Sequence, residues 1–218
     1  MTDASNAVLA ILGGTGDQGR GLARQFAKAG HRVIIGSRSA ERARQAAAEL
    51  GVEGVEGMAN ADAAGTADVT IAAVPYEGHA ELLAGLATEL AGKILVDCVN
   101  PLGFDERGPF PVRVPEGSAA EQAAALLPGT TVVAAFHHVS AKLLQDPEVA
   151  TFELDILVLG DDRAATDLVQ ALAARIPGMR GVYAGRLRNC AQVEAFTANL
   201  IAINRRYKAH AGIRITDI

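Results

Sequence analysis

One glycine-rich segment near the start of the chain has the spacing that suits the binding of a pyrophosphate. It reads Gly13-Gly14-Thr15-Gly16-Asp17-Gln18-Gly19 and directly follows the apolar run at residues 7–12. In a strand–turn–helix unit the glycines of such a segment allow a tight turn, close approach of the backbone to the phosphates and close packing of the helix. We therefore predict that this turn binds the pyrophosphate of a dinucleotide.

The residues at the end of the second apolar run predict which dinucleotide is bound. NAD-binding folds place a carboxylate at this position to bind the ribose 2′-hydroxyl. Here the run at residues 31–36 is followed by Ser37 and Arg38, and Arg42 lies one helical turn further on. A hydroxyl and planar guanidinium groups suit a 2′-phosphate, so we predict binding of NADP(H). The alternative is an ordinary exposed loop followed by a solvated helix arginine.

Three further segments stand where predicted strands end, which is where open α/β sheets bind ligands. Val74 and Pro75 end one strand, Asn100-Pro101-Leu102 follows a second, and His137-His138-Val139-Ser140 follows a third. Adjacent histidines on an extended segment point to opposite sides, so they make a poor chelating pair. We expect at least one of them to contact a ligand. The alternative for Pro75 is that it only ends its strand.

The sequence contains no nucleophile elbow and no HExxH motif, so we predict neither a catalytic side chain nor a metal site. That absence agrees with hydride transfer between two cofactors, which depends mainly on proximity and orientation.

The elements that would position these residues alternate between strand and helix patterns. We predict strands at 7–12, 31–36, 52–58, 68–75, 94–97, 131–136, 154–160 and near 182. We predict helices at 18–29, 39–50, 61–66, 79–90, 118–127, 161–176 and 187–206, and a long loop at 98–115. The pattern indicates an α/β fold with a doubly wound, mostly parallel Rossmann sheet. Residues 1–184 would form the NADP-binding domain, and residues 185–218 a small C-terminal helical domain that caps a cleft.

Bulk composition limits the partners. The chain has 218 residues, a formal charge of −5 and 50% hydrophobic residues. The acidic balance argues against nucleic-acid binding, and no apolar run is long enough for a membrane span or resembles a signal peptide. Two distant cysteines form no disulfide or metal pattern, so we expect a reduced, cytoplasmic setting.

A C-terminal basic stretch is either a solvated helix face or an electropositive wall for an acidic ligand. It comprises Arg186, Arg188, Arg205, Arg206, Lys208, His210 and Arg214.

Nearly the whole chain resembles the NADPH-dependent F420 reductases. The similarity is carried by the glycine turn, by Gly36-Ser37-Arg38 with Arg42, by Val74-Pro75, by the His137 segment, by Gly160-Asp161-Asp162 and by residues 189–215. The resemblance implies a deazaflavin cleft between two domains, usually in a homodimer, with NADP(H) and coenzyme F420 as the cofactors. It implies NADP contacts at Thr15, Gly16, Asp17, Gln18, Ser37, Arg38, Arg42, Val74 and Ala141, and it places Ile213 near the deazaflavin.

The chain departs from the archaeal form of this family at several positions. Asp17-Gln18 replace a more usual Asn-Leu, and Arg42 stands for a lysine. A carboxylate near a pyrophosphate is unfavourable unless it points away or accepts backbone amide protons. We expect reversible hydride transfer between NADP(H) and F420, with small-molecule partners only. The alternatives are an NADPH-dependent reductase of another acceptor, such as a flavin or a ferric chelate, and a non-catalytic NADP-binding sensor.

Overall fold

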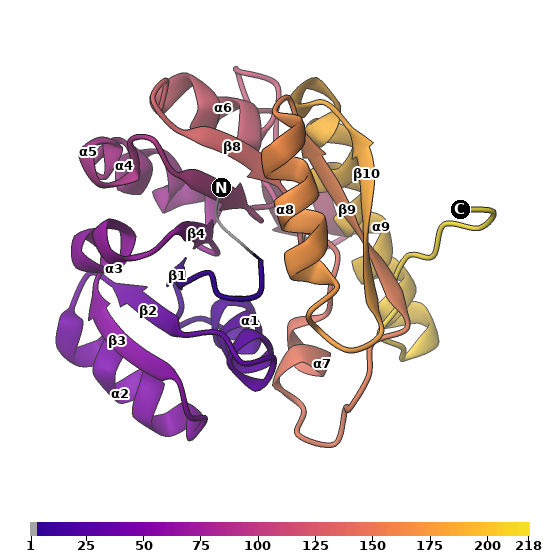
Figure 1. Ribbon diagram of the computed structural model, residues 1–218. Coiled ribbons are helices and arrows are strands. Elements are labelled where there is room, and N and C mark those ends of the chain that lie inside the picture. The colour runs from indigo at the N-terminus through magenta and orange to yellow at the C-terminus, as the bar shows by residue number, and fades with distance from the viewer. Residues whose placement is uncertain (1–3) are drawn as a thin grey trace.

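The computed structural model describes residues 4–218, so the first three residues of the predicted domain lie outside it. An eight-stranded sheet runs through the molecule in the order β10-β9-β8-β5-β4-β1-β2-β3, with helices on both faces (Figure 1). The six strands from β3 to β8 are parallel, β9 is antiparallel to β8, and β10 is parallel to β9. The prediction of a doubly wound, mostly parallel sheet is confirmed.

The strands of this sheet are short. They are β1 (Leu9–Leu12), β2 (Val33–Ser37), β3 (Val55–Ala59), β4 (Val69–Ala72), β5 (Ile94–Asp97), β8 (Thr131–Ala134), β9 (Leu154–Gly160) and β10 (Met179–Gly185). The α-helices are α1 (Asp17–Lys28), α2 (Ala40–Leu50), α3 (Asn60–Thr66), α4 (His79–Ala84), α5 (Ala87–Leu90), α6 (Ala119–Leu126), α7 (Ala141–Gln145), α8 (Arg163–Ala173) and α9 (Cys190–Tyr207), with 3-10 turns η1 (Tyr76–Gly78) and η2 (Leu187–Asn189).

The alternation of side chains along each strand builds two apolar layers. On β1, Leu9 and Ile11 pack with Leu22 and Phe26 of α1, whereas Ala10 packs against α3 on the opposite face. All four residues of β1 are buried, as expected for a central strand covered by helices on both sides. The first face carries α1, α2 and α8, and the second carries α3 to α6 and the start of α9.

Glycines set the turn between β1 and α1. Gly13 has φ +73°, and a Cβ there would lie 2.5 Å from the carbonyl oxygen of Ala73 at the end of β4. A Cβ on Gly19 would lie 2.6 Å from the Cα of Gly14, because the first turn of α1 packs directly on the loop. Both positions therefore require glycine, one for its backbone conformation and both for the close approach.

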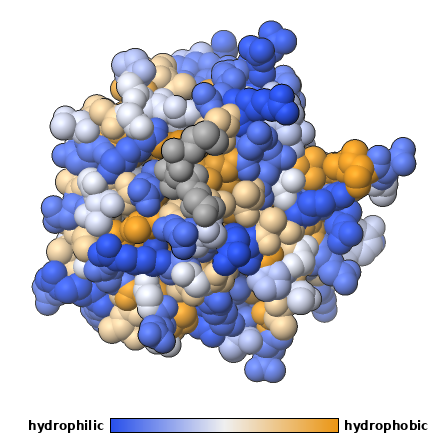
Figure 2. Space-filling view, in the orientation of Figure 1, coloured by the Kyte–Doolittle hydropathy of each residue, from blue (hydrophilic) through white to orange (hydrophobic). Residues whose placement is uncertain are grey.

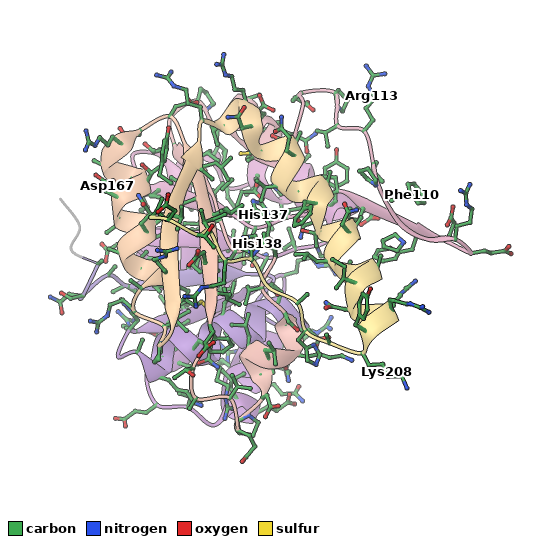
Figure 3. All side chains as sticks on the ribbon, turned by 90° about the vertical axis from the view of Figure 1, so that its right-hand side faces the viewer. Phe110, Arg113, His137, His138, Asp167 and Lys208 are labelled. Atoms are coloured by element: carbon green, nitrogen blue, oxygen red, sulfur yellow. The ribbon has the colours of Figure 1, made fainter. Side chains whose placement is uncertain are left out.

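Three local features differ from the sequence-based prediction. The predicted loop at 98–115 contains an antiparallel hairpin, β6 (Leu102–Asp105) and β7 (Gly108–Pro111), which projects beside α9 (Figure 3). The predicted helix at 79–90 is broken into α4 and α5 at Gly85 and Leu86. A short helix, α7, follows the histidine segment and packs against α1, where no helix was predicted.

Polar and charged side chains are spread over the face shown in Figure 2, and apolar side chains gather on the projecting C-terminal tail. Across residues 4–218, no helix combines the length and apolar character needed to cross a membrane.

Candidate functional site

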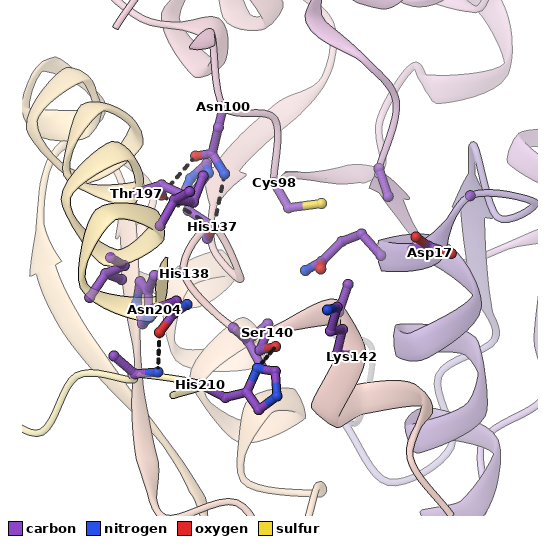
Figure 4. Close-up of a pocket in the computed structure, with 18 of the residues that line it drawn as sticks. Asp17, Cys98, Asn100, His137, His138, Ser140, Lys142, Thr197, Asn204 and His210 are labelled. Carbon is purple, nitrogen blue, oxygen red and sulfur yellow. Dashed lines mark hydrogen bonds between the residues drawn. The ribbon is translucent and has the colours of Figure 1, made fainter. Parts of the chain in front are cut away.

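A cleft of about 980 Å³ opens at the carboxyl ends of β1, β4, β5 and β8. Strand order reverses between β1 and β4, and such a switch point is where open α/β sheets bind ligands. Figure 4 shows α1 on one side of the cleft and α9 on the other. The residues that line it are Gly16–Gln18, Ala73–Pro75, Cys98–Asn100, His137–Lys142, Thr197, Leu200, Ile201, Asn204, Arg205 and Lys208–Ala211.

The glycine turn supplies one wall. Gly16 is the N-cap of the twelve-residue α1 and makes no side-chain cap, so N–H groups of the first helical turn are available to an anion. The side chain of Gln18 donates to the carbonyl oxygen of Phe136 (3.2 Å), which ties the turn to the end of β8. Gln145 of α7 donates to the main-chain oxygen of Asp17 (3.0 Å). The start of α1 is therefore held against the segment that follows β8.

The predicted 2′-phosphate residues lie at the end of the neighbouring strand. Ser37 ends β2, and Ser39 caps α2 by accepting the backbone N–H of Arg42 (3.3 Å). Arg38 and Arg42 are exposed, and within residues 4–218 neither guanidinium makes an ion pair or a side-chain hydrogen bond. Both cations are thus available for an anionic ligand that extends from the cleft.

The opposite wall rests on a buried histidine–aspartate pair. Asp97 ends β5 and His79 begins α4, both fully buried, with Nε2 of His79 2.6 Å from Oδ2 of Asp97. The other carboxylate oxygen of Asp97 accepts the N–H of Val99 (2.9 Å). Burial acts to lower the pKa of His79, but the hydrogen bond and negative charge of Asp97 outweigh it and raise that pKa. The pair holds the turn through which the chain enters the cleft.

Asn100 and Thr197 extend this support to α9. The side-chain amide of Asn100 donates to the carbonyl oxygen of His137 (2.8 Å), and the hydroxyl of Thr197 lies 3.3 Å from the same oxygen. The two side chains also contact each other, as the dashed lines in Figure 4 show. Segments from β5, β8 and α9 thereby converge on one peptide group.

The histidine segment is a turn, not the extended strand end that the sequence suggested. The preceding Phe136 has φ +62°, a left-handed conformation that is rare outside glycine, and the turn brings both His137 and His138 to the cleft. Backbone strain of this kind is characteristic of ligand sites. The expectation of an extended backbone at these two residues is therefore wrong.

Both imidazoles are buried and neutral at pH 7. Burial lowers the pKa of His137 to about 4, although the charge of Asp97 and the nearby carbonyls of Cys98 and Val99 oppose the shift. Burial also lowers the pKa of His138 to about 4. Nε2 of His138 accepts the N–H of Leu157 (3.3 Å), whereas neither ring nitrogen of His137 has a hydrogen-bond partner of good geometry. The two ring nitrogens of His137 are themselves buried, beneath the surface of the cleft.

The C-terminal segment closes the cleft on the α9 side. Asn204 holds the chain after α9, because its side-chain oxygen accepts the N–H of Ala211 (2.6 Å). His210 then reaches the hydroxyl of Ser140 (3.3 Å) across the cleft (Figure 4). Of the basic residues in the C-terminal stretch, only Arg205, Lys208 and His210 line the cleft.

Seven of the thirteen predicted site residues line the cleft: Gly16, Asp17, Gln18, Val74, Pro75, His137 and Ala141. Gly14 and Thr15 belong to the adjoining turn, and Ser37, Arg38 and Arg42 lie at the neighbouring strand end. Ile213 is not among the lining residues; its carbonyl oxygen accepts the N–H of Asp155 on β9 (2.7 Å). Sequence reasoning placed Asn100 at a strand end but missed Thr197 and Asn204, whose place in the site depends on long-range packing. Within residues 4–218 no cluster of side chains suited to a metal ion is found.

Comparison with known proteins identifies the family. A family model described as NADP oxidoreductase, coenzyme F420-dependent, matches residues 8–101. The F420-dependent NADP reductase of Methanothermobacter thermautotrophicus is 41% identical over 221 residues, covering 96% of this chain and 95% of the relative. The chain belongs to the F420-dependent NADP reductase family. A solved structure from Arthrobacter sp. FB24 superposes with a TM-score of 0.81, at 28% identity, over 97% of this chain and all of that one.

Two more distant matches are a metalloreductase and an imine reductase. The metalloreductase STEAP3 of Rattus norvegicus is 34% identical over 86% of this chain, which spans only 36% of that protein. An imine reductase from Myxococcus stipitatus has a TM-score of 0.65 at 18% identity, which shows the fold alone. The match covers 93% of this chain but 62% of the imine reductase, so the imine reductase has a large additional part.

Glu194, on α9, has a buried carboxylate whose pKa predicts how the stability of the protein changes with pH. Its carboxylate is buried and accepts the N–H groups of Ala119 and Ala120 at the start of α6 (2.9 and 3.2 Å). Burial nevertheless raises the pKa of Glu194 to about 7, from an ordinary value of 4.5. Between pH 4.5 and 7 the folded state therefore keeps a proton on Glu194 that the unfolded state has lost. The stabilisation from this proton is complete below pH 4.5 and is lost as the pH rises through 7.

We expect Glu194→Gln to remove this pH dependence. Between pH 5 and 8 the free energy of unfolding of the wild type should fall relative to that of the variant, by on the order of 3 kcal/mol in total. Urea unfolding at several pH values measures the difference between the two proteins. Parallel pH profiles for the two proteins would contradict the assignment.

Proposed function

We propose that this chain transfers a hydride reversibly between NADP(H) and coenzyme F420, the reaction for which its archaeal relatives are named. The observation that carries the proposal is a cleft that lies beside both the glycine turn and the exposed arginines. The chain that forms it is 41% identical to those reductases over 96% of its length. The cleft volume of about 980 Å³ lies at the top of the roughly 300–1,000 Å³ typical of ligand pockets. Such a volume suits two ring systems side by side.

The residues of the glycine turn fit the pyrophosphate of NADP(H). The turn at Thr15 and Gly16 and the first N–H groups of α1, including that of Gln18, would bind it, because no side chain caps this helix. Asp17 keeps its main-chain oxygen bonded to Gln145 and borders the cleft. Ser37, Arg38 and Arg42 would bind the 2′-phosphate, because both guanidinium groups lack an internal partner within residues 4–218.

The rest of the cleft fits an acidic second cofactor. Three of its lining residues are cations (Lys142, Arg205 and Lys208), and the only carboxylate among the described lining residues is Asp17. His137 lines the cleft, and we propose that its segment orients the polar edge of a deazaflavin. NADPH supplies the hydride and F420 accepts it. The protein's own residues bind and orient the two rings and exclude water, and we assign no side chain as an acid or base.

We further propose that residues 185–218 act as a separate small domain and that the protein forms a homodimer in a reducing, cytoplasmic setting. Both cysteines are free and buried, which agrees with such a setting. Aromatic side chains on the hairpin and α9 support the homodimer, since Phe104, Phe110 and Phe196 are 62%, 44% and 42% exposed. Single exposed apolar residues are common, but a group on one side of a protein marks an interaction surface. Light scattering in solution would report the molar mass.

The reaction is tested directly by mixing the protein with F420 and NADPH. We expect the visible absorbance of F420 to be lost with NADPH and to persist with NADH. Bleaching with neither nucleotide, in a protein that still binds NADPH, would contradict the proposal.

The similarity to a metalloreductase favours one alternative acceptor. STEAP3 matches most of this chain, so an NADPH-dependent reductase of a ferric chelate or a flavin is the second candidate. Assays with each acceptor in place of F420 distinguish the two. Tight NADPH binding without turnover on any acceptor would indicate an NADP sensor.

The 2′-phosphate assignment predicts a cofactor-specific effect. Arg38→Ala should raise the KM for NADPH about tenfold or more, because a hydrogen bond to a charged group contributes roughly 1.5–3 kcal/mol. The weak use of NADH should change little. Arg44→Ala is a matched control, since Arg44 is exposed on the same helix as Arg42. Equal losses with NADPH and NADH would refute the assignment.

The cationic side of the cleft predicts salt-sensitive binding of F420. Arg205→Ala combined with Lys208→Ala should raise the KM for F420, and the effect should shrink as added salt screens the charges. Arg206→Ala provides the control, because Arg206 is exposed next to Arg205 but does not line the cleft. A similar change in the control would mean that net charge alone, and not the cleft, affects binding.

A further inference from the structure

The chain after α9 forms a strap that ends on the edge of the sheet. Residues 208–218 contain no helix or strand, and Lys208 leaves α9 in a left-handed conformation (φ +51°). The first part of the strap, Lys208–Ala211, lines the cleft, as Figure 4 shows for His210. The second part lies along β9, where the N–H of Asp155 donates to the carbonyl oxygen of Ile213 (2.7 Å).

Asp155 and Arg180 hold that second part. They are paired residues on the neighbouring strands β9 and β10, and Arg180 donates to both carboxylate oxygens of Asp155 (2.9 and 2.7 Å). The remaining bonds of the pair go to the strap. Asp155 Oδ2 accepts the N–H of Ile215 (2.7 Å), and Arg180 donates to the main-chain oxygens of Ile215 (2.8 Å) and Ile218 (2.7 Å).

The chemistry of this pair goes beyond that of a surface ion pair. The Asp155 side chain is only 1% exposed, so its carboxylate needs several donors to offset the loss of water. The bidentate arginine and a backbone N–H supply them, in the arrangement that gives strong charge-assisted hydrogen bonds. The Arg180 hydrogen bonds hold the pKa of Asp155 below its usual value. The carboxylate is therefore ionised and available to the strap at all physiological pH values.

The held segment and the cleft segment are separated by a single residue. Gly212 links Ala211 to Ile213, and a Cβ on Gly212 would lie 3.0 Å from the Cβ of Leu154 on β9. The backbone there is pressed against the sheet. Because there is no slack between the two segments, release of Ile213 and Ile215 would free one end of the cleft segment, which would then depend on the bonds of Ala211 with Asn204 and of His210 with Ser140.

We infer that Asp155 and Arg180 are positioning residues for the second cofactor: they fix the strap to β9 and β10 and so hold Lys208–Ala211 in place as a wall of the cleft. They touch no lining residue of the glycine turn, so binding of NADP(H) does not depend on them. The inference rests on the proposed function in taking F420 as the ligand of that wall.

Hydrogen exchange and kinetics test the inference together. In Asp155→Asn and in Arg180→Ala, amide exchange within residues 208–215 should accelerate, and the KM for F420 should rise about fivefold or more while the Kd for NADPH stays within about twofold. A chain truncated after Gly212 should show the same change in the KM for F420 with the ion pair left intact. It removes the held segment, including the N–H of Ile215, but leaves Asp155 paired with Arg180, so it serves if the first variants fold poorly.

The control is Asp167→Asn, which breaks an exposed ion pair with Arg163 on the adjacent α8 (3.7 Å), remote from the strap (Figure 3 labels Asp167). It should leave exchange and both cofactors unaffected. Unchanged exchange in Asp155→Asn and Arg180→Ala, or faster exchange with an unchanged KM for F420, would overturn the inference. If the wild type does not reduce F420, the proposed function fails on its own, and exchange alone then decides whether the pair holds the strap.

Discussion

The burial of the Asp97 carboxylate is the constraint on which the cleft depends. A carboxylate with no exposed surface is stable only when charged or N–H partners replace its water. Asp97 obtains them from His79 and from the N–H of Val99, and this fixes the path of the chain after β5. Asn100, three residues further on, can then reach the carbonyl of His137, and Thr197 of α9 joins the same group. Loss of the buried pair would therefore loosen three segments at once.

Two other buried carboxylates act in the same way at different places. Glu194 fixes the start of α6 to α9 through two backbone N–H groups, and Asp155 fixes the C-terminal strap to β9. Each carboxylate bonds to backbone N–H groups that have no partner within a helix or a strand ladder: those at the start of α6 for Glu194, and one in the strap for Asp155. The sheet supplies a rigid base, and these acidic side chains fix the irregular segments that form the cleft.

The sequence predicted the sheet better than the walls of the cleft. β5 and β9 have the bounds expected from their apolar runs, and α6 lies within the helix predicted at 118–127, with Ser118 as its N-cap. These features depend on neighbours within one strand or one helical turn. The hairpin was missed because Pro109 and Pro111 are typical of loops, yet an isolated hairpin edge tolerates proline.

The glycine turn and the strand ends were predicted because their residue types carry the signal. The uncharged polar residues of α9 that line the cleft were not predicted. Thr197 and Asn204 have no special spacing, and they reach the site only because α9 packs across the ends of β5 and β8. The left-handed Phe136 is likewise invisible in the sequence, since a phenylalanine gives no sign of a positive φ. Its turn is what brings both histidines to the cleft.

The distribution of charge in the cleft follows from burial. Deep in the site, the loss of water keeps His137 and His138 neutral, with pKa values of about 4, so the inner wall carries no positive charge at pH 7. Nearer the solvent, Arg205 and Lys208 stay exposed and charged. A ligand with an uncharged ring system and an anionic tail matches this gradient, with the ring deep in the cleft and the tail toward α9. Reversing the ligand would place its anionic groups beside neutral, desolvated imidazoles, where they lose hydration and gain no ion pair. The gradient thus orients such a ligand before any contact specific to its ring is made.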